Sequence, residues 1–337
     1  MAGGSGGHIF PAIAVAKKMR QKKQNIKIEF WCSRGKLDQK IFSSTDENFN
    51  TIFSGKWRRY FSWQNFIDPI FVFLGFWESF FKLIFARPKA IFSKGGFVSV
   101  PVVFAGWILR IPIILHESDS IPGLANRICS KFATHIFSAF PGKFGKLSGL
   151  PIDLELFSST QKKIKIFSDQ KPIVLFFGGS QGSNFLDKIF LQISENFLNT
   201  TNFILITNNT KIKITHKNQK IFSLLPQKNF FQILQNSQIV VSRSGSSIFE
   251  IAAAEKPAIL IPHEFGGGNH QKKNAEILEN FGAAKIFSQQ DFDFLSFKNF
   301  LQKLLENKNL QNELSKKIKK FAPKNAAEKI AEKILIF

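Results

Sequence analysis

The chain has 337 residues and a formal net charge of +22, with 46 Lys and Arg against 24 Asp and Glu. This length and a hydrophobic fraction of 44% predict two globular domains. Two cysteines without pairing or metal-ligand spacing indicate a reduced cytosolic compartment. Six histidines and these cysteines form no ligand cluster, so we expect no metal and no other cofactor.

The basic charge is typical of proteins that meet nucleic acid, an anionic membrane or a phosphorylated substrate. However, the chain has 41 Phe and a single Tyr, as compositional drift in AT-rich codons produces. We therefore take drift as the main cause of the charge, which can still strengthen a membrane-binding surface. We expect no nucleic-acid partner.

Apolar runs typical of buried strands alternate with helical patterns, which predicts an α/β architecture with parallel sheets. Gly149 and Pro151 lie near the midpoint, so we place the domain boundary at residue 150. A last amphipathic helix is expected over Pro323–Ile336. The expected strands are Ile26–Trp31, Ala90–Phe92, Ile113–Leu115, Ile173–Phe177, Phe203–Thr207, Ile239–Val241 and Ala258–Ile261.

The chain opens with a glycine-rich loop, Gly3–His8, that runs directly into an apolar helix. Glycines let the backbone approach a ligand, and the following helix points its N–H groups at that ligand. A loop of this kind normally follows a buried strand. Because only Met1 and Ala2 precede it, we expect the first strand of the N-terminal domain to be missing.

Three further loops have the same arrangement of small residues between a strand and a helix: Ser93–Pro101, Gly178–Gly182 and Ser242–Ser247. Such turns are where open α/β sheets bind ligands. Four of them in two halves favour a cleft between two Rossmann-like domains. None has the full dinucleotide fingerprint, which argues against a nicotinamide enzyme.

Polar residues follow the expected strand Ile113–Leu115. His116, Glu117 and Asp119 are well placed there for acid–base chemistry, although Asp119 also suits the N-cap of the next helix. A second acidic pair, in Asp291–Asp293, spells the DxD of metal-dependent sugar transferases. It precedes an apolar-periodic stretch, so we interpret it as a helix cap.

The segment Pro69–Phe85 is almost entirely apolar, with only Glu78 and Lys82 charged. Its 17 residues are at the short limit for a membrane span, and the two charges near its middle argue against one. A core helix is an alternative. We favour an interfacial helix whose aromatic face enters lipid between basic flanks. That face would be Phe73, Phe76, Trp77, Phe80, Phe81 and Ile84, and the flanks Lys56, Arg58, Arg59, Arg87, Lys89 and Lys94.

These segments together resemble the MurG family of peptidoglycan N-acetylglucosaminyltransferases. The resemblance covers most of the chain in order and rests on GGSGGHIFPAIAVA, KGGFVSVP, IPIILHESDSIPGLANR, FFGGSQGS and SRSGSSIFEIAAAEKPAILIPHEFGGGNHQKKNAEILENFGAA. It implies the GT-B fold, with two Rossmann-like domains whose parallel sheets face a central cleft. Residues 1–150 would bind the acceptor and membrane, with a C-terminal helix, 323–337, packing back on them. Residues 151–322 would bind UDP-GlcNAc.

The resemblance implies an inverting transfer of GlcNAc from UDP-GlcNAc to the MurNAc 4-hydroxyl of lipid I, undecaprenyl-pyrophosphoryl-MurNAc-pentapeptide, which gives lipid II. The protein would act peripherally at the cytoplasmic face of the membrane, on its anionic surface. Two alternatives stay open. One is a degenerate membrane-associated protein that binds sugar nucleotide without turnover, and the other is a GT-B transferase with another lipid acceptor.

The resemblance also implies residue roles. His8 is the first candidate for the base and Glu117 the second. Glu250 would accept from the ribose hydroxyls, and Arg243 would order the donor loop or help to balance charge. The donor is expected at Ser5, Gly6, Gly7, Asp119, Ser180, Gln181, Gly182, Arg243, Gly245, Ser246, Ser247, Glu250, His270 and Gln271, and the acceptor at Lys94, Gly95 and Gly96.

Two residues depart from the family pattern. The family usually has Asn at the position of Asp119 and often has Arg at that of Asp153. Both changes add negative charge near a diphosphate, so we expect them to weaken its binding.

Overall fold

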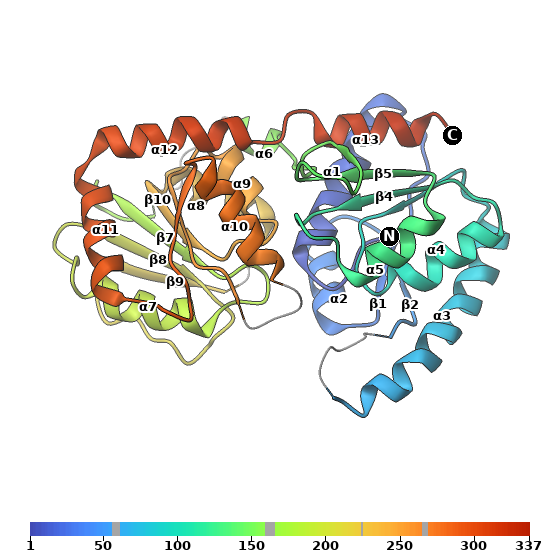
Figure 1. Cartoon of the computed structure of the whole chain (residues 1–337), viewed down its shortest axis with the longest axis horizontal. Coiled ribbons are helices and arrows are strands. Elements are labelled where there is room, and N and C mark those ends of the chain that lie inside the picture. The colour runs from blue at the N-terminus through green and yellow to red at the C-terminus, as the bar shows by residue number, and fades with distance from the viewer. Residues whose placement is uncertain (56–60, 159–165, 224, 265–268) are drawn as a thin grey trace. The chain divides into compact units, whose positions relative to one another are not determined.

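The structure is a computed structural model that describes residues 1–55, 61–158, 166–223, 225–264 and 269–337. The chain divides into two units: Met1–Asp153 with Pro323–Phe337, and Leu154–Ala322. Each unit has a sheet core with helices around it (Figure 1). Every strand pairing among the described residues is parallel.

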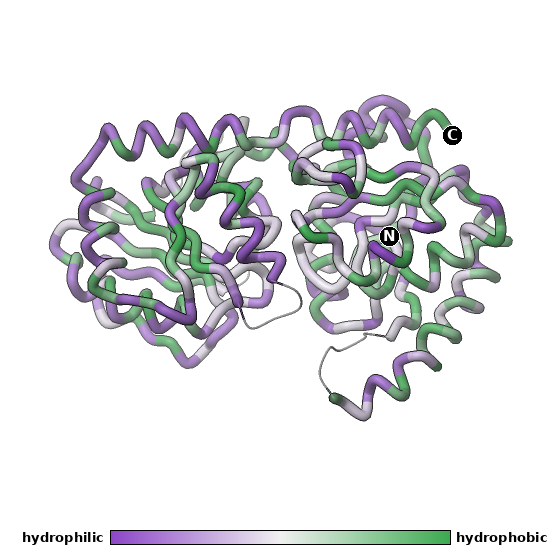
Figure 2. The backbone as a smooth tube through the Cα atoms, viewed as in Figure 1, coloured by the Kyte–Doolittle hydropathy of each residue, from purple (hydrophilic) through white to green (hydrophobic). Residues whose placement is uncertain are grey.

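The second unit is built on a six-stranded sheet in the order β12-β11-β10-β7-β8-β9. The strand order reverses between β7 and β10, because the chain runs outward from β7 to β9 and then from β10 to β12 on the other side. Buried apolar residues dominate β7, β8 and β10, as parallel strands covered on both faces require (Figure 2). The strands are β7 (Ile173–Phe177), β8 (Asn202–Ile206), β9 (Gln219–Phe222), β10 (Ile239–Ser242), β11 (Ala258–Leu260) and β12 (Ala284–Ile286).

Helices of the second unit begin at side-chain caps in three cases. Ser183, Asp293 and Asn307 each accept from a backbone N–H in the first turn of the helix that follows. The interpretation of Asp291–Asp293 as a helix cap is therefore confirmed. The helices are α6 (Glu155–Ser158), α7 (Asn184–Ser194), α8 (Gln227–Asn236), α9 (Ile248–Ala253), α10 (His270–Asn280), α11 (Phe294–Glu306) and α12 (Lys308–Phe321).

The first unit contains a four-stranded sheet, β3-β4-β5-β6, and a separate pair, β1-β2. Met1 and Ala2 bridge the two. The Met1 amine donates to the carbonyl of Phe92 at 3.0 Å, and Ala2 N–H donates to that of Trp31 at 3.1 Å. The order across the unit is therefore β2-β1, then residues 1–2, then β3-β4-β5-β6. The strands are β1 (Phe30–Ser33), β2 (Phe49–Ile52), β3 (Ile91–Ser93), β4 (Ile113–Glu117), β5 (His135–Ser138) and β6 (Lys146–Leu147).

The C-terminal helix packs along the first helix of the chain (Figure 1). Val15 and Met19 share a core with Ile330 and Ile334, and Lys22 forms ion pairs with two glutamates of the C-terminal helix. The helices of the first unit are α1 (Gly6–Lys22), α2 (Lys36–Phe42), α3 (Gln64–Ala86), α4 (Ser99–Ile108), α5 (Leu124–Cys129), a 3-10 turn at Ser130–Phe132 and α13 (Ala326–Leu335).

One expected strand is mostly wrong. The strand predicted over Ile26–Trp31 begins only at Phe30, and residues 26–29 have no strand pairing. Ile26 and Ile28 instead pack against the core that α1 and α13 share. Their alternation reflects burial beside a helix rather than a place in a sheet.

Candidate active site

Each unit carries two loops of small residues at the point where its strand order reverses. In the second unit these are residues 178–183 after β7 and 243–247 after β10. In the first unit they are residues 3–5 after the Met1–Ala2 bridge and 94–98 after β3. The carboxyl ends of strands at such a reversal are the ligand site of open α/β sheets. The structure thus pairs the four predicted loops, two in each unit.

The first loop is held by Asp38 of α2, a residue that the sequence analysis missed. The N–H of Gly4 donates to both carboxylate oxygens of Asp38, at 2.8 and 2.9 Å. Ser33 donates to the same carboxylate from its hydroxyl and its N–H. A Cβ at Gly3 would lie 2.6 Å from Oδ2 of Asp38, so the approach requires glycine.

Helix α1 begins at Gly6, so Gly6, Gly7 and His8 form its first turn rather than an irregular loop. Ser5 precedes them in an extended conformation, and its carbonyl accepts from the N–H of His8 at 3.1 Å. The side chain of His8 is half-buried. The partial positive charge at this end of the helix favours a negatively charged group nearby.

The second loop lies directly against the first. Gly95 and Gly96 have φ of 91° and 83°. A Cβ at Gly96 would lie 2.5 Å from the carbonyl oxygen of Gly3 and 3.8 Å from Cδ2 of His8. Only glycine permits this contact. The structure therefore brings His8 beside the loop predicted to bind the acceptor.

Lys94, predicted to contact the acceptor, points into the interior and is fully buried. Its Nζ lies 2.8 Å from Nδ1 of His116 and donates to the Ser118 hydroxyl. Nε2 of His116 lies 3.0 Å from the Gly149 carbonyl, which only accepts. Nε2 therefore carries the hydrogen, and Nδ1 accepts from Lys94.

Burial sets the protonation of both members of this pair. It lowers the pKa of Lys94 to about 7, against the charges of Glu117 and Asp119, which raise it. Burial and the charge of Lys94 hold the pKa of His116 well below its usual value. His116 is therefore neutral, which agrees with its role as the acceptor from Lys94.

The carboxylate of Glu117 is 3% exposed and is enclosed by the chain that follows it. Oε1 accepts from the N–H of Asp119 at 2.9 Å, and Oε2 accepts from Gly123 N–H at 3.1 Å and from Nδ2 of Asn126 at 2.8 Å. Burial, and after it the charge of Asp119, raises the pKa of Glu117. Both oxygens of this candidate base thus hold residues 119–126 in place.

Asn126 of α5 was missed by the sequence analysis. Besides binding Glu117, its amide lies against Gly95, where a Cβ would approach Oδ1 to 2.7 Å. Oδ1 accepts no hydrogen bond within the described part of the chain. The sequence signal that could have found Asn126 is its position as a polar residue on the buried side of a short helix.

In the second unit, the loop after β7 closes tightly on itself. Gly179 and Gly182 have φ of 77° and 74°, and the N–H of Gly182 donates to the Gly179 carbonyl at 3.1 Å. Ser180 and Gln181 lie at the tip, where Gln181 is exposed. The predicted diphosphate contacts thus precede the N-terminus of α7.

Arg243 connects this loop to the ends of β10 and β11. Its Nε and Nη2 donate to the hydroxyl of Ser183 at 3.1 and 2.7 Å. Its Nη1 donates to the carbonyls of Ile261 and Pro262 at 2.9 and 3.0 Å. Burial lowers the pKa of Arg243 to about 10, and Glu264 opposes the shift. Arg243 was expected either to order the donor loop or to help balance charge. These hydrogen bonds are those of a residue that orders the loop.

The loop after β10 leads into α9, which carries Glu250. Gly245, Ser246 and Ser247 are partly exposed there. Burial raises the pKa of Glu250 to about 8, against a hydrogen bond with Gln227 that lowers it. A carboxyl group with this pKa is mostly protonated at neutral pH.

His270 and Gln271 form the start of α10, after Asn269 with φ of 57°. Gln271 accepts twice, at Oε1 from His263 N–H at 2.9 Å and at its carbonyl from the Ser244 hydroxyl at 2.7 Å. The start of α10 is thereby tied to the loop after β10. Residues 265–268, which precede it, lie outside the described residues.

Glu264 is a further residue that the sequence analysis missed. Its side chain is 3% exposed and accepts from the Ser288 hydroxyl and from the N–H groups of Gln289 and Gln290. These hydrogen bonds lower its pKa against the effect of burial, the largest single cause. The Glu264 carboxylate is therefore ionised at neutral pH, near the loops that Arg243 connects.

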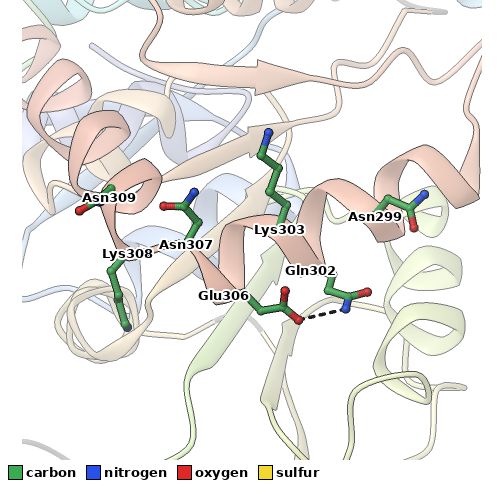
Figure 3. Close-up of a pocket in the computed structure, with 7 residues that line it drawn as sticks. All are labelled: Asn299, Gln302, Lys303, Glu306, Asn307, Lys308 and Asn309. Atoms are coloured by element: carbon green, nitrogen blue, oxygen red, sulfur yellow. Dashed lines mark hydrogen bonds between the residues drawn. The ribbon is translucent and has the colours of Figure 1, made fainter.

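A groove of about 650 Å³ lies away from these loops, at the junction of α11 and α12 (Figure 3). Amides and lysines line it, and Gln302 donates to Glu306 within it at 3.0 Å. We assign it no role in the site. The lining residues are Asn299, Gln302, Lys303, Glu306, Asn307, Lys308 and Asn309.

Helix α3 is long and apolar enough to cross a membrane, and 17% of its most apolar stretch is buried. Its two central charges face the first unit. Glu78 accepts from the N–H of Phe53 at 2.9 Å and from Lys82 at 3.0 Å, and Lys82 also donates to the Thr51 carbonyl at 3.4 Å. Arg34 pairs with Glu78 at 3.2 Å. The helix is therefore fastened along the unit by one face, and is neither a core helix nor detached from the unit.

The other face of α3 joins α4 in an exposed surface that we call the α3–α4 patch. The predicted lipid-facing residues Phe73, Trp77 and Phe81 are 61%, 42% and 54% exposed. Phe76, Phe80 and Ile84 were predicted with them but are half-buried, and Phe76 and Phe80 pack on the core. The α3–α4 patch consists of Phe66, Ile70, Phe73, Leu74, Trp77 and Phe81 of α3 with Phe104, Trp107 and Ile108 of α4.

The basic flank of α3 is smaller than predicted. Arg87 and Lys89 are exposed, whereas Lys94 is buried and does not belong to it. Lys56, Arg58 and Arg59 lie outside the described residues. Arg110 and Lys131, which the sequence analysis did not include, are exposed at the end of α4 and after α5.

Comparison with known families matches both units. Residues 1–138 match the glycosyltransferase family 28 N-terminal domain, and residues 173–330 match the family's C-terminal domain. The chain belongs to glycosyltransferase family 28. The prediction of a glycosyltransferase is thereby confirmed.

Curated relatives of this family 28 glycosyltransferase align over almost its whole length. A protein of Clostridium kluyveri is 34% identical over 97% of this chain and 96% of its own. One of Borreliella burgdorferi is 34% identical over 99% and 94%. Both are named UDP-N-acetylglucosamine--N-acetylmuramyl-(pentapeptide) pyrophosphoryl-undecaprenol N-acetylglucosamine transferase. The resemblance to the MurG family is confirmed.

Solved structures share the fold of this family 28 glycosyltransferase. The crystal structure of Acinetobacter baumannii MurG has a TM-score of 0.75 at 21% identity, covering 100% of this chain and 98% of that one. UDP-GlcNAc 2-epimerase from Neisseria meningitidis, bound to UDP-GlcNAc, has a TM-score of 0.69 at 14% identity, covering 99% and 98%. The predicted GT-B class is confirmed, and a shared fold does not by itself select the reaction.

Proposed function

We propose that this family 28 glycosyltransferase transfers GlcNAc from UDP-GlcNAc to the MurNAc 4-hydroxyl of undecaprenyl-pyrophosphoryl-MurNAc-pentapeptide, giving lipid II. The observation that carries the proposal is the alignment of the named relatives over at least 97% of the chain. The aligned residues include the two loops at the strand-order reversal of each unit, which Asp38 and Arg243 hold in place.

His8 is the general base of the proposed reaction. Inversion in one displacement needs a base beside the acceptor hydroxyl, which takes its proton as the bond to the sugar forms. His8 is half-buried in the first turn of α1, beside Gly96. Glu117 is the weaker candidate, because both its oxygens already accept hydrogen bonds from the chain around it.

The second unit binds the donor in this proposal. Ser180, Gln181 and Gly182 precede α7, whose N-terminus favours the diphosphate and stabilises the charge that develops on the leaving UDP. Arg243 keeps their loop in position through the hydroxyl of Ser183. Glu250 accepts from the ribose hydroxyls, and His270 with Gln271 contacts the sugar.

The lipid acceptor reaches the first unit from a membrane surface. The α3–α4 patch presents large aromatic residues, and Arg87, Lys89, Arg110 and Lys131 are exposed on the same unit. Aromatic residues beside basic ones suit the headgroup region of an anionic bilayer. Because Glu78 and Lys82 fasten α3 along the unit, the helix lies on the cytoplasmic membrane face rather than crossing it.

The departures at Asp119 and Asp153 do not favour the non-catalytic alternative. Asp153 forms an ion pair with Lys17 at 2.8 Å. Asp119 is near enough to Lys94 to raise its pKa. Each added carboxylate thus has a cation beside it, which reduces its repulsion of a diphosphate.

Transfer of radiolabelled GlcNAc from UDP-GlcNAc to a lipid I analogue tests the reaction. We expect a labelled disaccharide lipid from the full chain and none from UDP-glucose at the same concentration. Calorimetric binding of UDP-GlcNAc without transfer would contradict the proposal and support the sugar-nucleotide-binding alternative. Transfer to diacylglycerol instead would support the alternative with another lipid acceptor.

Sedimentation with vesicles of anionic phospholipid tests the membrane surface. We expect Phe73→Ser/Trp77→Ser/Phe81→Ser to lose most of the vesicle binding. The matched control is Ile214→Ser/Phe281→Ser/Leu295→Ser, which removes exposed apolar residues from the second unit and keeps wild-type binding. Equal vesicle binding by the two triple variants would contradict the proposal that the α3–α4 patch binds the membrane.

A further inference from the structure

We propose that Lys94 is a positioning residue of the site in the first unit, whose buried ammonium holds His116 and Ser118 in place and balances the charges of Glu117 and Asp119. The kinetic consequences rest on the proposed function. The charge coupling itself does not, and a separate measurement tests it.

Lys94 joins three segments that are distant in sequence. Its N–H donates to the carbonyl of Met1 at 3.0 Å, at the bridge between β1 and β3. Its side chain crosses from the end of β3 to the end of β4, where Nζ meets Nδ1 of His116 at 2.8 Å and the hydroxyl of Ser118. Its side chain thereby contacts both the end of β4, at His116, and Ser118, the first residue after that strand.

The surroundings of Lys94 explain why an ammonium is tolerated in the interior. A buried charge is costly unless it is hydrogen-bonded and balanced by an opposite charge. His116 and Ser118 supply the acceptors, and Glu117 and Asp119 supply negative charge. Among the described residues, His8 is a further titratable group that acts on this cluster, through His116.

The charge balance makes the site sensitive to pH. The pKa of Lys94 is lowered to about 7, so the ammonium is largely present at pH 6 and largely lost at pH 8. Loss of the ammonium leaves the charges of Glu117 and Asp119 unopposed beside the loops that bind anionic substrates. We therefore expect KM for these substrates to rise as the pH increases through about 7.

Four proteins test the proposal: wild type, Lys94→Met, Asp119→Asn and the double variant. Methionine keeps the apolar stem and removes the ammonium. At pH 6.5 we expect Lys94→Met to lower kcat/KM roughly tenfold, the size of a one-unit pKa interaction, mainly through KM. The double variant should recover most of the loss. The decline of kcat/KM as the pH rises through about 7, which we call the alkaline limb, should be absent from both Lys94→Met and the double variant.

A purely structural role for Lys94 predicts different results. In that case the double variant would be as impaired as Lys94→Met, or the alkaline limb would persist in both. Thermal unfolding of all four proteins shows whether they are folded. If Lys94→Met does not fold, the Asp119→Asn protein alone decides, because the rise of KM above about pH 7 must weaken once the charge of Asp119 is removed.

NMR titration of 13Cε-labelled lysines separates this proposal from the proposed function. The Lys94 resonance is assigned by its absence in Lys94→Met. We expect its midpoint near pH 7 in the wild type and at lower pH in Asp119→Asn. An unchanged midpoint in Asp119→Asn would refute the coupling, whatever the transferase assay shows. A lowered midpoint with no transfer by any protein would leave the coupling standing and overturn the proposed function.

Discussion

The two units build their ligand loops at equivalent positions but hold them with opposite chemistry. In the second unit a buried cation, Arg243, holds the loop after β7 through the hydroxyl of Ser183 and is itself fixed by the carbonyls of Ile261 and Pro262 after β11. In the first unit a buried anion, Asp38, holds the loop through backbone N–H groups. The two loops of the second unit are made mostly of glycine and serine. The first unit collects His8, Lys94, His116 and Glu117 around its loops.

This difference matches a division of labour between binding and proton transfer. A diphosphate site needs aligned N–H groups, and an arginine that contacts the loop can order them without titrating. A site that removes a proton from a hydroxyl needs a group whose pKa lies near neutrality. In the proposed reaction, the titratable side chains therefore gather at the site of proton transfer, and the proposed donor site contributes one carboxyl group with a pKa near neutrality, Glu250.

Removing Arg243 should cause the largest change among the loop-holding residues. In Arg243→Ala, Ser183 and two carbonyls lose a charged donor, which costs about 2–3 kcal/mol in that region. We expect UDP-GlcNAc affinity to fall roughly 100-fold by calorimetry, as that energy implies. Arg243→Lys keeps the charge but not the planar fork, and should be intermediate. Wild-type affinity in Arg243→Ala would contradict the loop-ordering role.

Changing Asp38 should affect the other unit and spare donor binding. Asp38→Asn puts an amide donor against the N–H of Gly4 or the donors of Ser33. We expect kcat to fall about tenfold, from the loss of roughly one charged hydrogen bond, with unchanged affinity for UDP-GlcNAc. Asp46→Asn, an exposed change of equal charge in the same unit, is the control. An equal loss of donor affinity in Asp38→Asn would remove the distinction between the units.

The smallest effect concerns the proton on Glu250. Because its pKa is raised to about 8, the carboxyl group is mostly protonated in the unliganded protein at pH 7. Ribose hydroxyls that donate to the ionised form lower this pKa, so donor binding releases a proton and affinity rises from pH 6 to 8. Calorimetry in buffers of different ionisation enthalpy should detect release of roughly half to one proton. The release should vanish in Glu250→Gln, and proton uptake would contradict the assignment.

How far the sequence predicts this protein depends on whether a feature is local. Glycine turns after apolar runs are local signals, and the turns at Gly95, Gly96, Gly179 and Gly182 have the positive φ that glycine allows. The short strand β12, Ala284–Ile286, has no such signal, because it is three residues long and one of them is an exposed lysine. Its pairing with β11 is determined by the sheet.

The site was less predictable than the fold because its residues meet only through tertiary packing. Asp38 lies 34 positions from Gly4, and Ser183 lies 60 from Arg243. Nothing next to Lys94 in sequence indicates that its side chain turns inward to His116. The runs of glycine and serine in the sequence predicted where the loops lie, but the residues that hold these loops come from other elements.

In the proposed reaction, the first unit performs proton transfer and the second unit binds the donor. Measuring transfer and UDP-GlcNAc affinity together in His8→Asn and Glu250→Gln tests it most directly. We expect His8→Asn to lower kcat by roughly 10²–10⁴ with wild-type donor affinity. Glu250→Gln should lose donor affinity and keep transfer at saturating donor within about tenfold of wild type. Loss of donor affinity in His8→Asn with kcat preserved would contradict the claim.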